Sequence, residues 1–348
     1  MKFRPPHFVV VGLAALAVVV LQLVSSSVNT TSSANTTDST ATTRNSSALG
    51  QMGGCVANES PPRGCSVTFF PVFPSCDEEK DESCSFHLHR NLAALTPLMY
   101  ALAGVLESTP ASWPVFILHL PAERGGAQRT ARWMHDGRML DVMSDDVDSH
   151  DAVQSVRTGL ANRRVRFEPI PTIPANGTYN IHIHQKIWFR PWWWKRWIRD
   201  GFEMLLAFEA DTAFCAGGAL EYGGIEGFGC ELRRLGVTYI GAPWVRSVSP
   251  WCRYNDLCYC CCNSGLALWN VNVAANQQVL GRTFHLQKQN RGNVDIVTII
   301  YNRRNGSSIS ADAALGTRVE MVSQAFSVES RWDGVSVPFG VHKVRGTL

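Results

Sequence analysis

One short segment limits the possible folds of this chain more than any other. The apolar run Met204-Leu205-Leu206-Ala207-Phe208 leads directly into Glu209-Ala210-Asp211. The run predicts a buried strand, and ligands of open α/β sheets bind outside the carboxyl ends of such strands. Residues two apart in an extended strand point to the same side, so we expect Glu209 and Asp211 to face one divalent ion. Acidic pairs after strands also form turns and helix caps, and the pair alone leaves both roles open.

Helical and strand-like segments alternate along much of the chain. Apolar residues at helical spacing predict helices over 91–107 and 151–164. Short apolar runs predict further strands at 115–118, 165–167 and 239–242. This alternation predicts an α/β layer fold with a mainly parallel sheet flanked by helices.

The N-terminus carries a membrane signal. An apolar run from Phe8 to Val24 follows Lys2 and Arg4, which favours a cytosolic N-terminus and a single-pass type II orientation. A cleavable signal peptide has a similar layout, but Val24-Ser25-Ser26 is a poor cleavage site. We therefore expect a cytosolic tail over 1–7 and a transmembrane signal anchor over 8–24, whereas cleavage would give a secreted protein.

Two further features favour the secretory pathway. The chain has 11 cysteines, as expected in an oxidising compartment, and six N-x-Ser/Thr sequons without proline. Residues 25–54 are rich in Ser and Thr, lack aromatic residues and predict a glycosylated stem. We expect a protein of the Golgi or endoplasmic reticulum membrane with a luminal domain. The sequons begin at Asn29, Asn35, Asn45, Asn58, Asn176 and Asn305.

The cysteines form two groups. Residues 55–86 contain Cys55, Cys65, Cys76 and Cys84, which predict a disulfide-rich collar with three possible pairings. Regular structure is expected to begin near His87, in a domain over 87–348. The second group lies within 252–262 and includes a C-x-x-C, but a structural zinc site normally needs a second pair. Disulfides are therefore expected there, tying this insertion to Cys215 or Cys230.

Charge and aromatic patterning argue against a nucleic-acid partner. The net charge is only +3, and no long basic run occurs. Residues 190–197 mix aromatic and basic side chains, but Trp193 and Trp197 are four apart and predict one buried helix face. His182 and His184 alternate without a third ligand nearby, so a loop or strand face is expected for them.

Further motifs follow the acidic strand in a distinctive order. Together they resemble an uncharacterised family of glycosyltransferase-like proteins, catalogued as a domain of unknown function. Its members have a Phe-Gln-x-Asp-like strand end, Tyr-x-Gly-Ala-Pro-Trp, an Asn-Gly-Gly loop, a Glu-Asp pair and a late Gly-x-His-Lys. The matching segments here are Tyr239-Ile240-Gly241-Ala242-Pro243-Trp244, Asn263-Ser264-Gly265, Val294-Asp295 and Gly340-Val341-His342-Lys343, within about residues 88–345.

The resemblance implies a GT-A-like, Rossmann-type domain that binds a nucleotide-sugar and a divalent metal, manganese or magnesium. It implies that Asp211 and His342 bind the metal, with Glu209 close to the nucleotide's ribose or the metal. Asn263 and Gly265 belong to the loop expected beside the donor. Without the family, His342 reads as a surface or structural residue.

The resemblance also implies a general base. Asp295 matches the Asp of the family's Glu-Asp pair and would take the proton of the acceptor hydroxyl. From the residues alone, Asp295 is equally a helix N-cap before the apolar segment that follows it. The function predicted by the resemblance is transfer of a sugar from a nucleotide-sugar to a glycan or glycoprotein acceptor.

The chain departs from the family pattern at several positions. Val294 replaces the Glu of the pair, Ser264 the middle glycine and Trp269 the arginine, whereas Glu209 stands where Gln is frequent. These changes leave an alternative open: a catalytically inactive glycan-binding or cell-surface protein on the same scaffold. The presence of Asp211, Asp295 and His342 favours activity.

Overall fold

The computed structural model describes part of the chain, all within one compact unit over Gln51–Lys343. The described residues are 54–69, 84–119, 140, 150–170, 187–188, 190–215, 217–218, 220–242, 263–276, 313–328 and 337–342. The predicted anchor over 8–24, the stem up to residue 53 and the 252–262 cysteine group lie outside them. Among the described helices, none combines the length and apolar character needed to cross a membrane.

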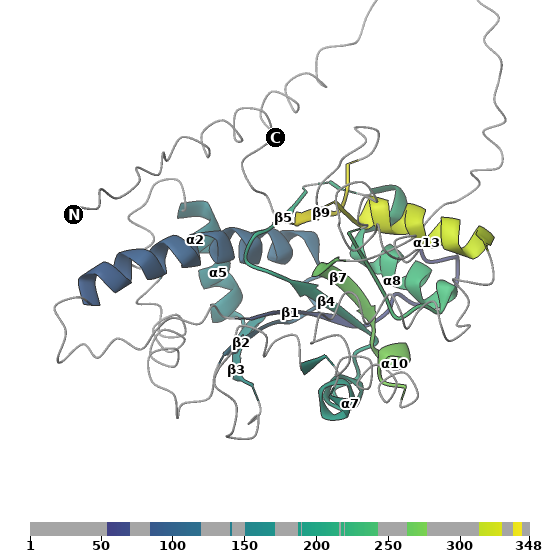
Figure 1. The fold of residues 1–348 in the computed structure, drawn as a ribbon, viewed down its shortest axis with the longest axis horizontal. Coiled ribbons are helices and arrows are strands. Elements are labelled where there is room, and N and C mark those ends of the chain that lie inside the picture. Colours follow the sequence, from purple (N-terminus) through teal and green to yellow (C-terminus); the bar gives the residue numbers. More distant parts are fainter. Residues whose placement is uncertain are drawn as a thin grey trace, which may run out of the picture. The chain divides into compact units, whose positions relative to one another are not determined.

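The main sheet has six strands in the order β3-β2-β1-β4-β7-β6 (Figure 1). The first four in this order are mutually parallel, whereas β7 runs antiparallel to both β4 and β6. This architecture confirms the predicted α/β fold with a mainly parallel sheet. The strands are β1 (Gly64–Phe69), β2 (Val115–His119), β3 (Val165–Pro169), β4 (Met204–Phe208), β6 (Tyr239–Ala242) and β7 (Asn263–Asn270).

Two strands of the main sheet were not predicted. The expectation that regular structure begins near His87 is wrong, because β1 lies at Gly64–Phe69 in the centre of the sheet. The sequence lacks the apolar run of a buried strand, because polar Ser66 and Thr68 alternate with Cys65 and Val67. All four residues are buried in the structure. The segment that begins at Asn263 was expected to be a loop but forms the eight-residue strand β7.

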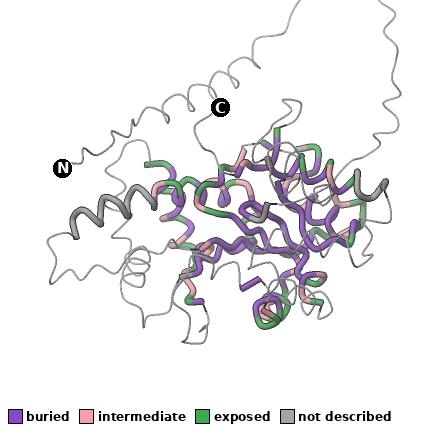
Figure 2. Tube along the Cα trace, viewed as in Figure 1, coloured by how far each residue is buried: buried purple, intermediate pink, exposed green. Residues whose placement is uncertain are grey.

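Helices cover both faces of the sheet (Figure 1). On one face, α2 (Cys84–Ser108), α5 (His150–Ala161), α8 (Gly224–Leu235) and α13 (Ala313–Phe326) share one apolar core with Met204, Leu206 and Phe208 of β4. On the other, α7 (Pro191–Arg199) and α10 (Val271–Ala274) share a second apolar core with Leu205 and Ala207. Strand alternation therefore sends successive β4 side chains into two separate apolar cores, and Figure 2 shows the strands as largely buried.

The second of these cores is built from tryptophans and is called the tryptophan core below: Trp188, Trp193, Trp194, Trp197 and Trp269. Trp188 stacks on Trp269 at 5.0 Å between ring centroids, and Trp193 meets Trp197 edge-on at 5.1 Å. Trp194 Nε1 donates a hydrogen bond to the Trp188 carbonyl at 2.8 Å. The prediction that Trp193 and Trp197 share a buried helix face is confirmed.

A small second sheet lies beside the main one, in the order β5-β9-β8. It consists of β5 (Thr212–Phe214), β8 (Ser327–Val328) and β9 (Gly340–His342). Strand β9 is antiparallel to β5 and parallel to β8, with His342 opposite Thr212. The C-terminal motif is thereby brought next to the end of β4.

The cysteines of the predicted collar have different roles. Cys55 forms a disulfide with Cys230 of α8, so Cys230 does not tie the 252–262 segment to the domain as predicted. Cys65 is a free, fully buried thiol in β1, which contradicts a disulfide role for it, and burial raises its pKa well above the usual range. Cys215 is also free.

Candidate metal centre

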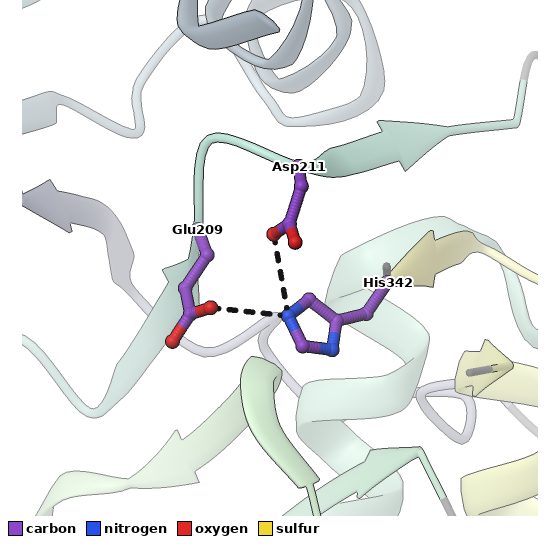
Figure 3. Close-up of side chains that lie close together, drawn as sticks. All are labelled: Glu209, Asp211 and His342. Carbon is purple, nitrogen blue, oxygen red and sulfur yellow. Dashed lines mark hydrogen bonds and ion pairs between the residues drawn. The ribbon is translucent and has the colours of Figure 1, made fainter. Parts of the chain in front are cut away.

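A turn at the carboxyl end of β4 presents two acidic side chains on one side (Figure 3). The Thr212 N–H donates to the Glu209 carbonyl at 3.1 Å, which reverses the chain between β4 and β5. Glu209 and Asp211 therefore converge through this turn, and not through the alternation of an extended strand as predicted. Their convergence itself agrees with the expectation from the sequence.

His342 completes the group, which we call the candidate metal centre: Glu209, Asp211 and His342. Its Nε2 lies 3.2 Å from Glu209 Oε2 and 3.4 Å from Asp211 Oδ1. The imidazole is 1% exposed, whereas each carboxylate side chain is 49% exposed. One ligand atom from each residue lies within 4.8 Å of the others. The buried Nε2 of His342 thus contacts two carboxylates that are half exposed to solvent.

The donor set fits a divalent ion. Carboxylate oxygens suit magnesium and manganese, and an added imidazole nitrogen widens the choice among transition metals. Burial lowers the pKa of His342, but hydrogen bonds to Asp211 and Glu209 outweigh this effect and raise the pKa to about 9. The carboxylates therefore favour positive charge at Nε2, where a proton and a metal ion would compete.

Gly265 on β7 contacts both the acidic turn and the His342 ring. Its carbonyl accepts the Glu209 N–H at 2.7 Å and the Thr212 hydroxyl at 3.4 Å. A Cβ added to Gly265 would lie 2.0 Å from His342 Nε2, far inside van der Waals contact. Only glycine leaves room for the imidazole at this position.

For the other predicted site residues, Asn263 and Asp295, the structure describes at most the backbone. Asn263 is the first residue of β7, and its backbone pairs with Ala242, while its side chain is not among the described ones. Asp295 lies outside the described residues. The structure thus brings together Glu209 and Asp211, Gly265 and His342, which come from three segments far apart in sequence.

Sequence reasoning missed two structural roles. It assigned Gly265 to donor binding and not to the seating of the His342 ring. It also passed over Thr212, which is buried and whose N–H and hydroxyl both fix the turn. The only signal available for Thr212 was its position directly after Asp211.

The location of the centre follows a general rule of open sheets. Strand β1 connects through α2 to β2 on one side, while its other neighbour is β4. Such a reversal of strand order opens a crevice at the carboxyl ends of the two strands, where ligands bind. Glu209 comes directly after β4, at the end of the strands where this rule places ligands.

Comparisons with known proteins give glycosyltransferases as structural neighbours. No family model and no curated protein matches the sequence, so the motif resemblance stays a prediction. The WbbM bifunctional glycosyltransferase is 10% identical, with a TM-score of 0.40 over 85% of this chain and 48% of that chain. Mouse xyloside xylosyltransferase 1 is 10% identical, with a TM-score of 0.39 over 82% of this chain and 98% of that chain.

The glycosyltransferase GlyE of Streptococcus pneumoniae TIGR4 is 9% identical, with a TM-score of 0.35 over 82% of this chain and 55% of that chain. This chain thus spans about half the length of WbbM and of GlyE. Because these TM-scores are below 0.5, the similarities decide neither the fold nor the activity.

Proposed function

We propose that this protein is a metal-dependent glycosyltransferase with a GT-A-like fold, which transfers a sugar from a nucleotide-sugar to a glycan or glycoprotein acceptor. The observation that carries the proposal is the convergence of Glu209, Asp211 and His342 at the carboxyl edge of a central strand. The order of the sequence motifs supports sugar transfer over other metal-assisted reactions.

In this proposal, Asp211 and His342 hold the divalent ion, and Glu209 lies beside it. A bound ion of this kind acts as a Lewis acid that stabilises charge on a departing nucleoside diphosphate. The two carboxylates alone would repel the diphosphate, because like charges at close range oppose each other. Donor binding should therefore require the cation.

The acceptor side rests on the resemblance. We assign the role of general base to Asp295, which would take the proton of the acceptor hydroxyl as the sugar is attacked. We also assign Asn263 to the donor pocket, since it begins the strand that continues to Gly265. Replacement of Asp295 by Asn should abolish transfer while donor binding persists.

The test uses the full-length protein purified in detergent. A panel of nucleotide-sugars is screened for binding and hydrolysis, with manganese or with a chelator. Manganese-dependent binding and hydrolysis of one donor are expected. Binding that is equally tight in chelator would contradict the metal role of Asp211 and His342.

One observation favours the second candidate, an inactive glycan-binding protein. Trp269 occupies the position of the family's arginine, and its ring is buried between Trp188 and Tyr239 in the tryptophan core. A buried indole offers no charge to a substrate. Glycan binding without hydrolysis of any nucleotide-sugar would support this candidate over the transferase.

We further propose a single-pass type II protein of the Golgi or endoplasmic reticulum membrane with a luminal domain. The apolar run over 8–24 and the sequon-rich stem support this location. Enzymatic removal of N-glycans should lower the mass of the protein made in eukaryotic cells. An unchanged mass would contradict luminal placement.

A further inference from the structure

A polar pocket lies at the amino ends of the parallel strands, at the other end of the main sheet from the candidate metal centre. Its volume is about 460 Å³, and its lining is Arg63, Ala111, Ser112, Pro114, Asn162, Arg163, Arg164, Arg166 and Phe202. Arg63, Pro114 and Arg164 directly precede β1, β2 and β3, so the pocket is at the amino ends of the strands. The length of β4, about 17 Å at 3.3 Å per residue, separates this edge from Glu209. The pocket is therefore distinct from the candidate metal centre and goes beyond the proposed function.

Arg164 places a fixed positive charge at this pocket. Its guanidinium donates only to neutral acceptors: the carbonyls of Trp113 at 3.2 Å, Leu106 at 2.8 Å, Thr109 at 2.7 Å and Pro110 at 2.9 Å, and the Thr109 hydroxyl at 2.9 Å. These bonds hold the half-buried group rigidly without a carboxylate partner among the described residues. Buried charges are normally paired, so this cation lacks the expected counter-ion.

Three more arginines surround the pocket and are exposed. The Arg63 guanidinium lies 5.2 Å from the centroid of the Phe202 ring. Arg166 Nε donates to the Arg163 carbonyl at 3.1 Å. Within the described part of the chain, none of the three side chains forms an ion pair. Their charges therefore add to that of Arg164.

The acidic residues nearest in sequence do not cancel this charge. The pocket lining contains no Asp or Glu. Glu203 accepts the backbone N–H of Arg63 at 3.3 Å, but its carboxylate pairs with Arg233. Two other acids close to the pocket in sequence also have arginine partners outside it: Asp200 with Arg199 and Glu168 with Arg196.

We propose that this pocket binds a tetrahedral oxyanion, a phosphate or sulfate group. Guanidinium groups suit such anions, since their planar forks donate paired hydrogen bonds to oxyanion oxygens. The volume falls in the range of roughly 300–1,000 Å³ that holds small organic ligands, so there is room for a carrier of the anion. Phe202 and Pro114 supply the apolar part of the lining, where the carbon atoms of such a carrier would lie.

The test is calorimetric titration of the full-length protein at near-physiological ionic strength, where weak surface attraction is screened. The probes are glucose 6-phosphate, glucose and inorganic phosphate. The variant combines Arg63→Gln with Arg163→Asn, because Arg163 has a φ of 61° and Asn tolerates this backbone region. Arg164 is left intact for its structural bonds. The matched control is Lys195→Gln, which removes an exposed charge outside the pocket.

Glucose 6-phosphate should bind, glucose should not, and the double variant should lose at least about tenfold in affinity while Lys195→Gln stays within about twofold. If inorganic phosphate binds as tightly as glucose 6-phosphate, the ligand is a free anion. If inorganic phosphate binds much more weakly, the ligand is a phosphate attached to a larger molecule. Either result supports the site. Equal binding of glucose and glucose 6-phosphate, or unchanged affinity in a folded double variant, would overturn it.

Discussion

The tryptophan core and the candidate metal centre are held together by different interactions. The core is apolar and buried, and ring packing holds it in place. The metal centre pairs a buried imidazole with two half-exposed carboxylates, held by one turn and one glycine. Changes in the core are therefore expected to act on folding, whereas changes at the centre are expected to act mainly on ligand binding.

The largest effect is expected in the core. Trp197 is 0% exposed, and Trp197→Ala should lower the free energy of unfolding by about 3–5 kcal/mol through the lost burial and the cavity. Trp192 on the same helix is 37% exposed, and Trp192→Ala should cost less than about 1 kcal/mol. Denaturant unfolding of both variants measures the difference. Equal losses in the free energy of unfolding would mean that burial of Trp197 in the tryptophan core adds no stability beyond that of exposed Trp192.

The next effect is catalytic. Asp211→Asn should lower turnover about a hundredfold, equivalent to nearly 3 kcal/mol, because electrostatic stabilisation of the leaving group is lost. Glu209→Gln should cost less, since Gln is frequent there in the family that the sequence resembles. The control Glu221→Gln alters an exposed acid of the 3-10 helix Leu220–Tyr222 and should be neutral. A stability loss in Asp211→Asn as large as that of Trp197→Ala would show that the metal centre stabilises the fold as strongly as the tryptophan core does.

A third change tests the role of the glycine behind the centre. Gly265→Ala should weaken manganese binding about tenfold, because the new Cβ would displace the His342 ring. Manganese titration of the single variants and of the pair with His342→Ala forms a double-mutant cycle. Once His342 is Ala, adding Gly265→Ala should cost no further affinity. Fully additive losses would show that Gly265 acts elsewhere.

The smallest effect is a pH dependence. Burial lowers the pKa of His342, but hydrogen bonds to Asp211 and Glu209 outweigh it and raise the pKa from 6.5 to about 9. In metal-free protein, the ion pairs of protonated His342 stabilise the fold. Their contribution to the free energy of unfolding is complete below about pH 6.5 and is lost as the pH rises through 9. Manganese requires the neutral imidazole, so its affinity should rise over the same interval.

Melting temperatures with and without manganese measure this pH dependence. The stabilisation by manganese should grow as the pH increases, and His342→Gln should remove most of the trend. A stabilisation that stays constant from about pH 6 to 9 would exclude proton competition at His342.

The strands with apolar runs were predictable because their local pattern contains the signal. Met204–Phe208 and Tyr239–Ala242 appear in the structure with their predicted bounds. Strand β1 was missed because its buried hydroxyl residues imitate a loop, and β7 because its motif was known only as a loop in the resemblance. The roles assigned to Asn263 and Asp295 stay predictions.

Local sequence patterns were enough to predict the α/β class, the acidic pair and the residue types of the candidate metal centre. Hydrophobic periodicity and residue chemistry are local properties, and they are legible without coordinates. The pairing of Cys55 with Cys230 and the contact of His342 with Glu209, 133 residues earlier, became visible only in the folded chain. The same holds for the position of the imidazole against Gly265. These contacts depend on how distant strands pair, and strand pairing is set by the burial of the whole sheet rather than by any one segment.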